Sequence, residues 1–313
     1  MTYNKLFLTQ YEITEKEYKT YITTIEDSYR KSYREIQDLL KTSYAKLSAV
    51  PPEEYYNELI KYNRYQELLK NMESSYKQAT KTTYSALKEG GDLATTNMYY
   101  RSEYTAEWAG ELIKGSINQN LVDASVTGSI KTWKKIGNEW AGIMPQYGTL
   151  IDLLNKNATQ DLQRIRSTLT SALLQGQSYT NTAKLLRSVL NSAAYKSVRV
   201  ARTEGNRSLN NGSYILGKDA ETQGIPITKM WDATLDTRTR QTHANADRQK
   251  RGIDENYNVG GAVGLYPSQL STTGENINCR CASVNLANGI EPQVRRARNP
   301  VKEIQWQNAT ATE

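Results

Sequence analysis

The sequence has 313 residues, of which 38% are hydrophobic, and its mean hydropathy is -0.70. This length allows two domains, but no apolar run approaches the roughly 18 residues of a membrane-spanning helix, so we expect no membrane partner. The formal net charge of +7 favours a polyanionic neighbour, such as DNA or an acidic protein surface.

The first predicted element is a long amphipathic helix over residues 11–48. Its apolar residues recur at helical spacing and form a heptad-like seam, and charged residues occupy its other faces. Such a helix packs on a neighbour, either within the chain or in another subunit. The seam consists of Tyr18, Ile22, Ile25, Tyr29, Ile36, Leu40, Tyr44 and Leu47.

Breaks in the periodic pattern divide the rest of the helical region. Pro51-Pro52 ends the first helix. A second helix runs to about Leu87, before Gly90-Gly91 interrupts the pattern. The remaining apolar periodicities predict helices over residues 93–145, 149–176, 183–190 and 194–222.

The character of the sequence changes after Gly224. The segment Ile-Pro-Ile-Thr-Lys-Met-Trp is typical of a strand entering a loop-rich unit. The predicted fold is therefore mainly α with a C-terminal α+β module, in which an elongated N-terminal helical arm precedes a compact loop-rich domain. We expect a helical arm or bundle for protein contacts at residues 1–190, the α+β module at 191–286 and a basic tail at 287–313.

Three blocks between residues 199 and 281 are the most specific part of the sequence. They are an Arg-Thr-Glu on a helix, a longer Lys-Met-Trp-Asp-Ala-Thr-Leu-Asp-Thr-Arg-Thr-Arg-Gln-Thr-His, and a final Glu-Asn-Ile-Asn-Cys-Arg-Cys. The single histidine and both cysteines of the chain lie in them. The motif residues are Arg202, Thr203, Glu204, Lys229, Trp231, Ala233, Asp236, Arg238, Thr239, Arg240, His243, Glu275, Ile277, Asn278, Cys279, Arg280 and Cys281.

These ordered blocks resemble those of the phage head morphogenesis family, the minor head proteins similar to the F protein of phage Mu. The resemblance covers roughly residues 165–286. One departure follows the histidine, where the family reads Leu-Asp-Gly-Gln and this chain has Ala246-Asp247-Arg248-Gln249. Because Arg248 takes a positive φ only at a cost, the turn after His243 can differ from the family's turn.

The resemblance implies a minor capsid protein of a tailed phage, made in the host cytoplasm and carried inside the head near the portal. It implies action in procapsid assembly and in DNA packaging or ejection. The sequence itself shows no catalytic set, so we expect no enzymatic activity. The implied partners are the portal protein, a major capsid or scaffold protein and the packaged double-stranded DNA, with several copies per virion. The basic run Arg295, Arg296 and Arg298 is the candidate for non-specific DNA contact.

His243, Cys279 and Cys281 are the candidates for a transition-metal site. Thiolates two positions apart on an extended segment point to the same side, so both can reach one Zn²⁺. A fourth ligand would be Asp236, Asp247 or water, whereas structural zinc sites use four Cys or His ligands. We therefore expect no cofactor and favour a metal-free cluster over zinc. The three side chains should be close together in either case.

The other polar motif residues are expected to form a semi-buried network that ties the loops together. Asp236 can cap the turn that follows it, while Arg238 and Arg240 can donate to the carboxylates of Glu204 and Glu275. Trp231 is the best candidate for a core anchor. The expected network comprises Arg202, Glu204, Trp231, Asp236, Arg238, Arg240 and Glu275.

Two rival functions remain at the level of sequence. One is a metal-dependent nuclease or other DNA-processing enzyme built on His243, Cys279 and Cys281, although neither a Gly-x-Ser-x-Gly turn nor a phosphate-binding Gly-x-x-x-x-Gly-Lys loop is present. The other is a host-directed effector, because related modules are joined to toxin domains. The short sequence after residue 286 argues against that second reading.

Overall fold

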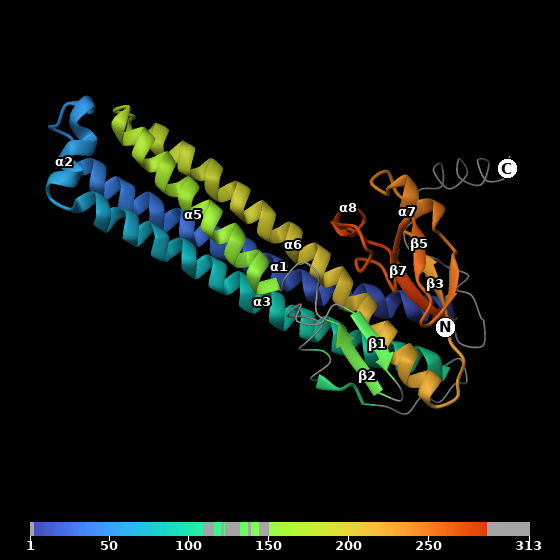
Figure 1. Cartoon of the computed structure of the whole chain (residues 1–313). Coiled ribbons are helices and arrows are strands. Elements are labelled where there is room, and N and C mark those ends of the chain that lie inside the picture. Colours follow the sequence, from blue (N-terminus) through green and yellow to red (C-terminus); the bar gives the residue numbers. More distant parts are fainter. Residues whose placement is uncertain are drawn as a thin grey trace. The chain divides into compact units, whose positions relative to one another are not determined.

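The structure is a computed structural model that describes residues 3–108, 116–119, 122, 132–136, 139–143 and 150–286 (Figure 1). Long helices dominate it, and the short strands of a small mixed module follow them in sequence. This confirms the predicted mainly α fold with a C-terminal α+β module. None of the helices in the described part of the chain is long and apolar enough to cross a membrane.

Among the described residues, the long helices are α1 (Tyr3–Ala45), α3 (Arg64–Trp108), α5 (Leu150–Leu174) and α6 (Tyr179–Thr222). A 3-10 turn at Pro52–Glu54 and the short helix α2 (Tyr55–Lys61) connect α1 to α3. The first helix ends at Ala45, six residues before the predicted stop at Pro51-Pro52, and turns over residues 46–49 lead to the prolines, which do not fit a helix interior.

Two predicted helix breaks are absent. Gly90 and Gly91 lie within α3, where both are buried, so packing outweighs the roughly 1 kcal/mol that each glycine costs in a helix. The helices predicted over residues 183–190 and 194–222 are one continuous helix, α6, of 44 residues. Neither Gly nor Pro lies between Tyr179 and Glu204 to interrupt it.

The prediction of helix throughout residues 93–145 was wrong. The antiparallel strands β1 (Thr132–Ile136) and β2 (Glu139–Ile143) lie in that segment, with Thr132 opposite Ile143. Their Trp, Thr and Ile residues favour strands. The sequence between them is Gly-Asn, a pair typical of two-residue hairpin connections.

The chain divides into two compact units that are interleaved in sequence. A helical unit comprises Tyr21–Leu87 and Gln146–Arg199, and a mixed unit comprises Met1–Thr20, Lys88–Pro145 and Val200–Glu313. Helices α1, α3 and α6 contribute residues to both units. The predicted boundaries at residues 190 and 286 divide the chain by sequence order instead, and they stay a prediction.

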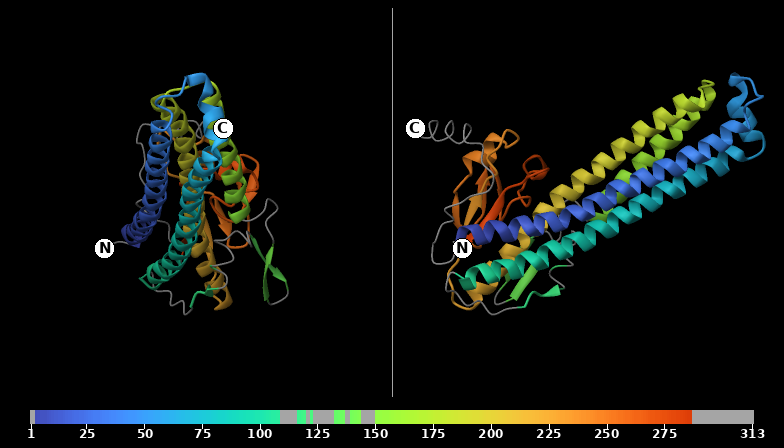
Figure 2. Two further views of the ribbon diagram at one scale, coloured as in Figure 1. Left: turned by 90° about the vertical axis from the view of Figure 1, so that its left-hand side faces the viewer. Right: turned by 180° about the vertical axis from the view of Figure 1, so that it is seen from behind.

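In the helical unit, parts of α1, α3, α5 and α6 run alongside one another (Figures 1 and 2). The α1 seam is buried there, since Ile25, Ile36 and Leu40 have 0% of their surface exposed. Tyrosine hydroxyls link the helices, as when Tyr29 bonds Ser197 of α6 at 2.8 Å. The seam therefore packs within the chain and is not left for another subunit.

The mixed unit contains a three-stranded antiparallel sheet in the order β4 (Lys250–Gly252), β3 (Thr228–Asp232), β7 (Ala282–Leu286). Strands β5 (Tyr257–Val259) and β6 (Ala262–Gly264) form a hairpin. Gly260 and Gly261 join them with φ angles of 59° and 85°, which a two-residue turn of this hand requires. The short helices are α7 (Gln241–Asn245) and α8 (Thr273–Asn276).

The buried polar residues of α6 fasten the start of β7 in the mixed unit. Asn210 donates from Nδ2 to the carbonyl of Cys281 at 3.2 Å and accepts from the N–H of Ser283 at 2.7 Å. Asn206 donates to the same carbonyl at 3.2 Å, and Asn285 donates back to Ser213 O at 2.6 Å. Buried backbone groups need such partners, so a polar helix face here is a structural requirement.

Candidate functional site

The second and third sequence blocks meet in the mixed unit. His243 lies in α7, and Cys279 and Cys281 lie in the segment that leads into β7. His243 Nδ1 is 3.4 Å from Cys281 Sγ and 3.6 Å from Cys279 Sγ. All three side chains are buried, and their potential ligand atoms lie within 4.8 Å of one another. The structure thus brings together the three side chains that the sequence singled out.

The first block holds the turn that positions the cysteines. Asn278 adopts a φ of 54°, a left-handed conformation that asparagine tolerates better than most residues. Its N–H donates to Thr203 Oγ1 of α6 at 3.1 Å. The N–H of Cys279 donates to Asn276 O at 3.2 Å, and β7 begins just after Cys281. Thr203 therefore sets the point at which the chain enters the strand.

Glu275 lies against the opposite edge of the histidine ring. His243 Nε2 is 2.8 Å from Glu275 Oε2, although the contact is not directed along the N–H bond. Thr242 donates from its hydroxyl to the same oxygen at 3.0 Å. The ring of Trp231 meets the imidazole edge-on, with centroids 5.6 Å apart. The imidazole is therefore fixed between two thiols, a carboxylate and an aromatic wall.

The electrostatics of the cluster shift the pKa of His243 and the pKa of Cys279 in the directions that favour an imidazolium and a thiolate. Burial alone would lower the pKa of His243, but the hydrogen bond and charge of Cys279 raise it above its ordinary value. Burial likewise would raise the pKa of the Cys279 thiol, but hydrogen bonds from Cys281 and His243 hold it well below its usual range. Nucleophilic or metal-ligating thiols share this property.

Asp236 forms the predicted cap, with a partner that the sequence did not suggest. Its Oδ1 accepts from the N–H of Arg238 at 2.9 Å. Its two oxygens accept from Arg280 at 2.5 and 2.6 Å in a forked ion pair. These contacts, the Arg280 hydrogen bond first, hold the pKa of Asp236 well below its usual range. Because side chains alternate along an extended segment, Arg280 can face Asp236 while its cysteine neighbours face His243.

The other predicted network residues have different partners from those expected. Glu204 pairs with Arg207, and Glu275 contacts His243. Arg240 donates to the carbonyl of Ile277 at 2.5 Å. Arg238 is 76% exposed and lies 3.7 Å from Asp236, and Arg202 is exposed. The expectation that Arg238 and Arg240 pair with Glu204 and Glu275 was wrong, because the intervening turns direct them to nearer groups.

Lys229 and Trp231 lie at the centre of the mixed unit. Both are at most 1% exposed. Lys229 Nζ donates to the carbonyls of Ile253 at 2.6 Å and Leu265 at 2.8 Å, and it lies 5.2 Å from the ring centroid of Tyr257. Trp231 belongs to the cluster of buried residues that includes both cysteines. The Lys-x-Trp motif therefore supplies a buried tie and a core anchor.

The turn after His243 contains a residue with a positive φ angle at the position where the family has glycine and this chain has Arg248. Arg248 adopts a φ of 65°, the conformation that glycine would take without strain. The N–H of Arg248 donates to Trp231 O at 2.9 Å, and the N–H of Trp231 donates to Gln249 O at 2.9 Å. Those pairings maintain the turn despite the missing glycine.

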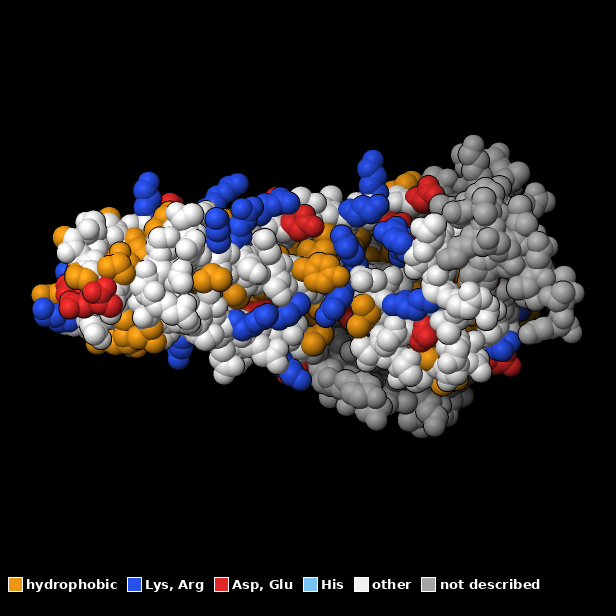
Figure 3. Space-filling model, turned by 90° about the horizontal axis from the view of Figure 1, so that it is seen from above, with side chains coloured by type: hydrophobic (Ala, Val, Ile, Leu, Met, Phe, Trp, Pro, Cys, Tyr) orange, Lys and Arg blue, Asp and Glu red, His pale blue; other side chains and the backbone are white. Residues whose placement is uncertain are grey.

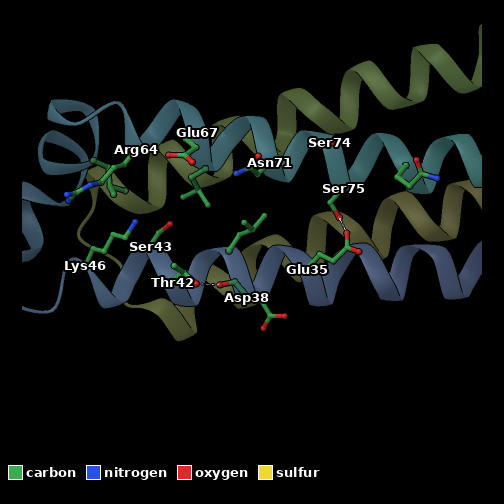
Figure 4. Close-up of a pocket in the computed structure, with 14 residues that line it drawn as sticks. Glu35, Asp38, Thr42, Ser43, Lys46, Arg64, Glu67, Asn71, Ser74 and Ser75 are labelled. Atoms are coloured by element: carbon green, nitrogen blue, oxygen red, sulfur yellow. Dashed lines mark hydrogen bonds between the residues drawn. The ribbon is translucent and has the colours of Figure 1, made fainter.

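The helical unit has a hollow surface of its own. A groove of about 680 Å³ opens between α1 and α3 (Figure 4). Charged and hydroxyl groups line it, among them Glu35, Lys46 and Glu67, and Ser75 donates to Glu35 at 2.5 Å. The candidate DNA contacts Arg295, Arg296 and Arg298 lie outside the described residues.

Comparisons with known proteins place these motifs in a family. Residues 163–284 match the model of the family described as Phage Mu protein F like protein. The chain is 27% identical over 246 residues to "Minor head protein GP7" of Bacillus phage SPP1, covering 78% of this chain and 75% of that protein. No solved structure gave a significant match.

A second relative has an enzymatic name. "NAD(+)--arginine ADP-ribosyltransferase EFV" of Enterococcus faecalis is 27% identical over 212 residues, covering 66% of this chain. The match spans only 39% of that protein. The resemblance predicted from the three blocks is confirmed: residues 163–284 match the Phage Mu protein F like family, and the chain is similar to a protein named as a minor head protein.

Proposed function

We propose that this protein is a minor component of a phage capsid that acts in head morphogenesis, inside the head and near the portal. The observation that carries the proposal is the extent of the match to minor head protein GP7, which reaches well beyond the family segment 163–284. Much of the helical unit therefore shares the relationship, and not the motif-bearing module alone. We further propose roles in procapsid assembly and in DNA packaging or ejection.

The helical unit offers a surface suited to polyanions. Residues 150–199 of α5 and α6 contain seven Lys or Arg and two Asp, whereas residues 21–87 have ten basic and nine acidic residues. Lys156, Arg164 and Lys184 are exposed. Figure 3 views α5 and α6 from above and shows basic side chains along them. This basic surface adds to the C-terminal tail as a contact for packaged DNA or for an acidic face of the portal, major capsid or scaffold protein.

DNA binding by the basic surface has a direct test. Glutamate at Lys156, Arg164 and Lys184 should weaken binding to double-stranded DNA, and the slope of log affinity against log salt should become shallower, because fewer counterions are released. A matched control places glutamate at Arg34, Lys41 and Lys46, which are exposed on α1. Equal effects of the two triple variants would assign the binding to net charge and not to α5 and α6.

The role in head assembly is tested in the phage itself. Inactivating the gene should reduce the yield of infectious particles, and the wild-type protein supplied from a plasmid should restore it. Electron microscopy of the particles formed without the protein should show a defect in heads or in their DNA content. Normal, infectious, DNA-filled heads in its absence would contradict the proposal.

The enzymatic relative suggests a control for catalysis. A segment shared by a minor head protein and a transferase does not by itself carry transferase activity, and the match leaves most of the transferase's length uncovered. We therefore propose a structural role. Purified protein incubated with NAD⁺ and an arginine acceptor should release no nicotinamide above background, and plasmid DNA with divalent metals should stay intact. Activity in either assay would support an enzyme instead.

A further inference from the structure

The geometry points to a zinc site in which His243 Nδ1 and the thiolates of Cys279 and Cys281 bind one Zn²⁺, with water as the fourth ligand. The sequence favoured a metal-free cluster, because it lacks a fourth Cys or His. The proposed zinc site replaces that expectation. The site links α7 to the segment that enters β7. Its function would be to fasten two sequence blocks that no disulfide joins, since neither cysteine forms one.

The two nitrogen–sulfur distances in the cluster match tetrahedral coordination. Zn–S bonds of about 2.3 Å and Zn–N bonds of about 2.0–2.1 Å place neighbouring ligand atoms roughly 3.5–3.8 Å apart. The histidine nitrogen lies 3.4 and 3.6 Å from the two sulfurs. A single ion can therefore contact all three atoms with only small shifts of the side chains.

Glu275 provides an independent second observation. Ligating histidines usually direct their other ring nitrogen to a carboxylate, which fixes the tautomer and the orientation of the ring. Here Nε2 lies 2.8 Å from Glu275 Oε2, while Nδ1 faces the sulfurs. The carboxylate therefore stands beside the ring nitrogen that faces away from the sulfurs, in a close contact that is not aligned along the N–H bond, and its position does not depend on the thiols.

The carboxylates proposed from sequence as a fourth ligand are occupied elsewhere. Asp236 holds Arg280 through both oxygens, and Asp247 accepts from the N–H of Ala233 at 2.9 Å. The sequence contains no further Cys or His. A water molecule is the remaining small ligand for a site whose three protein ligands are each about 2% exposed.

Metal content of the purified full chain tests the site. We expect about one zinc per chain after gel filtration in reducing buffer without chelator, and loss of that zinc in Cys279→Ser and in Cys281→Ser. Cobalt reconstitution gives a more specific readout: thiolate-to-cobalt charge-transfer absorption can arise only from these two residues, because the chain has no other cysteine.

A matched variant distinguishes a ligand from its support. Glu275→Gln keeps all three ligands, so it should still bind one cobalt with the same charge-transfer band but with about 10–100-fold weaker affinity. If the cysteine variants fail to fold, the wild-type protein gives the answer, because chelation should lower its melting temperature and added zinc, but not magnesium, should restore it.

Three results would overturn the site. One is wild-type protein without zinc, without a cobalt–thiolate band and without stabilisation by zinc. Another is bound zinc that survives in both cysteine variants, which would place it elsewhere. The third is a Cys279–Cys281 disulfide in the native protein, detected by mass spectrometry.

Discussion

At the scale of single residues, Lys229 is the clearest case of a motif residue whose role only the structure reveals. A lysine two positions before a tryptophan in the sequence gives no sign that its amine will be buried. The structure places it against two backbone carbonyls and the ring of Tyr257. Burial lowers its pKa from 10.5 to about 7, while Asp254 and Glu255 act in the opposite direction. A neutral amine still has two N–H groups, one for each carbonyl.

This lowered pKa predicts a pH dependence of stability. Between pH about 7 and about 10.5 the unfolded chain holds a proton on Lys229 that the folded protein lacks, so stability rises with pH in that window. Lys229→Met should be less stable by roughly 1–3 kcal/mol for each carbonyl that loses its donor. The deficit should widen from pH 7 to pH 9.5, as measured by chemical denaturation. A deficit that stays constant with pH would show that Lys229 keeps its proton.

Arg248 gives a second residue-scale prediction. Its φ of 65° is costly for a residue with a Cβ. Arg248→Gly should therefore be more stable than Arg248→Ala by about 1 kcal/mol, because the two variants lose the same long side chain and differ only in backbone freedom. Thermal melts of the pair decide it, and equal melting temperatures would mean that the turn relaxes without strain.

At the scale of elements, hydrophobic periodicity located the helices but not their breaks. The α1 seam was predicted from its spacing, and Ile25, Ile36 and Leu40 are indeed buried. Gly90-Gly91 did not end α3, because helix propensity is a weak local term beside the packing of a long helix. The cluster of His243 with both cysteines followed from the blocks. The residues that support the cluster could not be predicted from the sequence, because their contacts depend on which turns face one another in the fold. They are Glu275, Thr203 and Arg280.

The hydrogen bonds between α6 and the start of β7 lead to a prediction about stability. Asn210→Ala removes the acceptor of the Ser283 N–H, while Cys281 O keeps Asn206 as a donor, so it should destabilise the protein by about 1–3 kcal/mol, the cost of one buried group left without its partner. Asn191→Ala is the control, since Asn191 is exposed on the same helix and should change stability by less than about 0.5 kcal/mol. Similar losses in both variants would contradict this role for Asn210.

At the scale of the whole molecule, the features proposed to be functional are distributed over the two units. The mixed unit contains the family motifs and the proposed zinc site, and the helical unit contains the basic surface of α5 and α6. Composition alone predicted an affinity for polyanions from the net charge of +7. It did not predict where on the surface the positive charge is concentrated. That depends on which helices carry basic residues without acidic residues nearby to neutralise them.

The most direct test of the proposed function is to count this protein in purified procapsids. Capsids would be assembled by co-expressing the phage's major capsid and scaffold proteins with this chain, with and without the portal protein. Quantitative mass spectrometry would then give the copies per particle. We expect a few copies in particles that contain the portal and a marked loss without it. Absence from both kinds of procapsid would contradict the assignment as a minor head protein, and equal amounts in both would contradict its place near the portal.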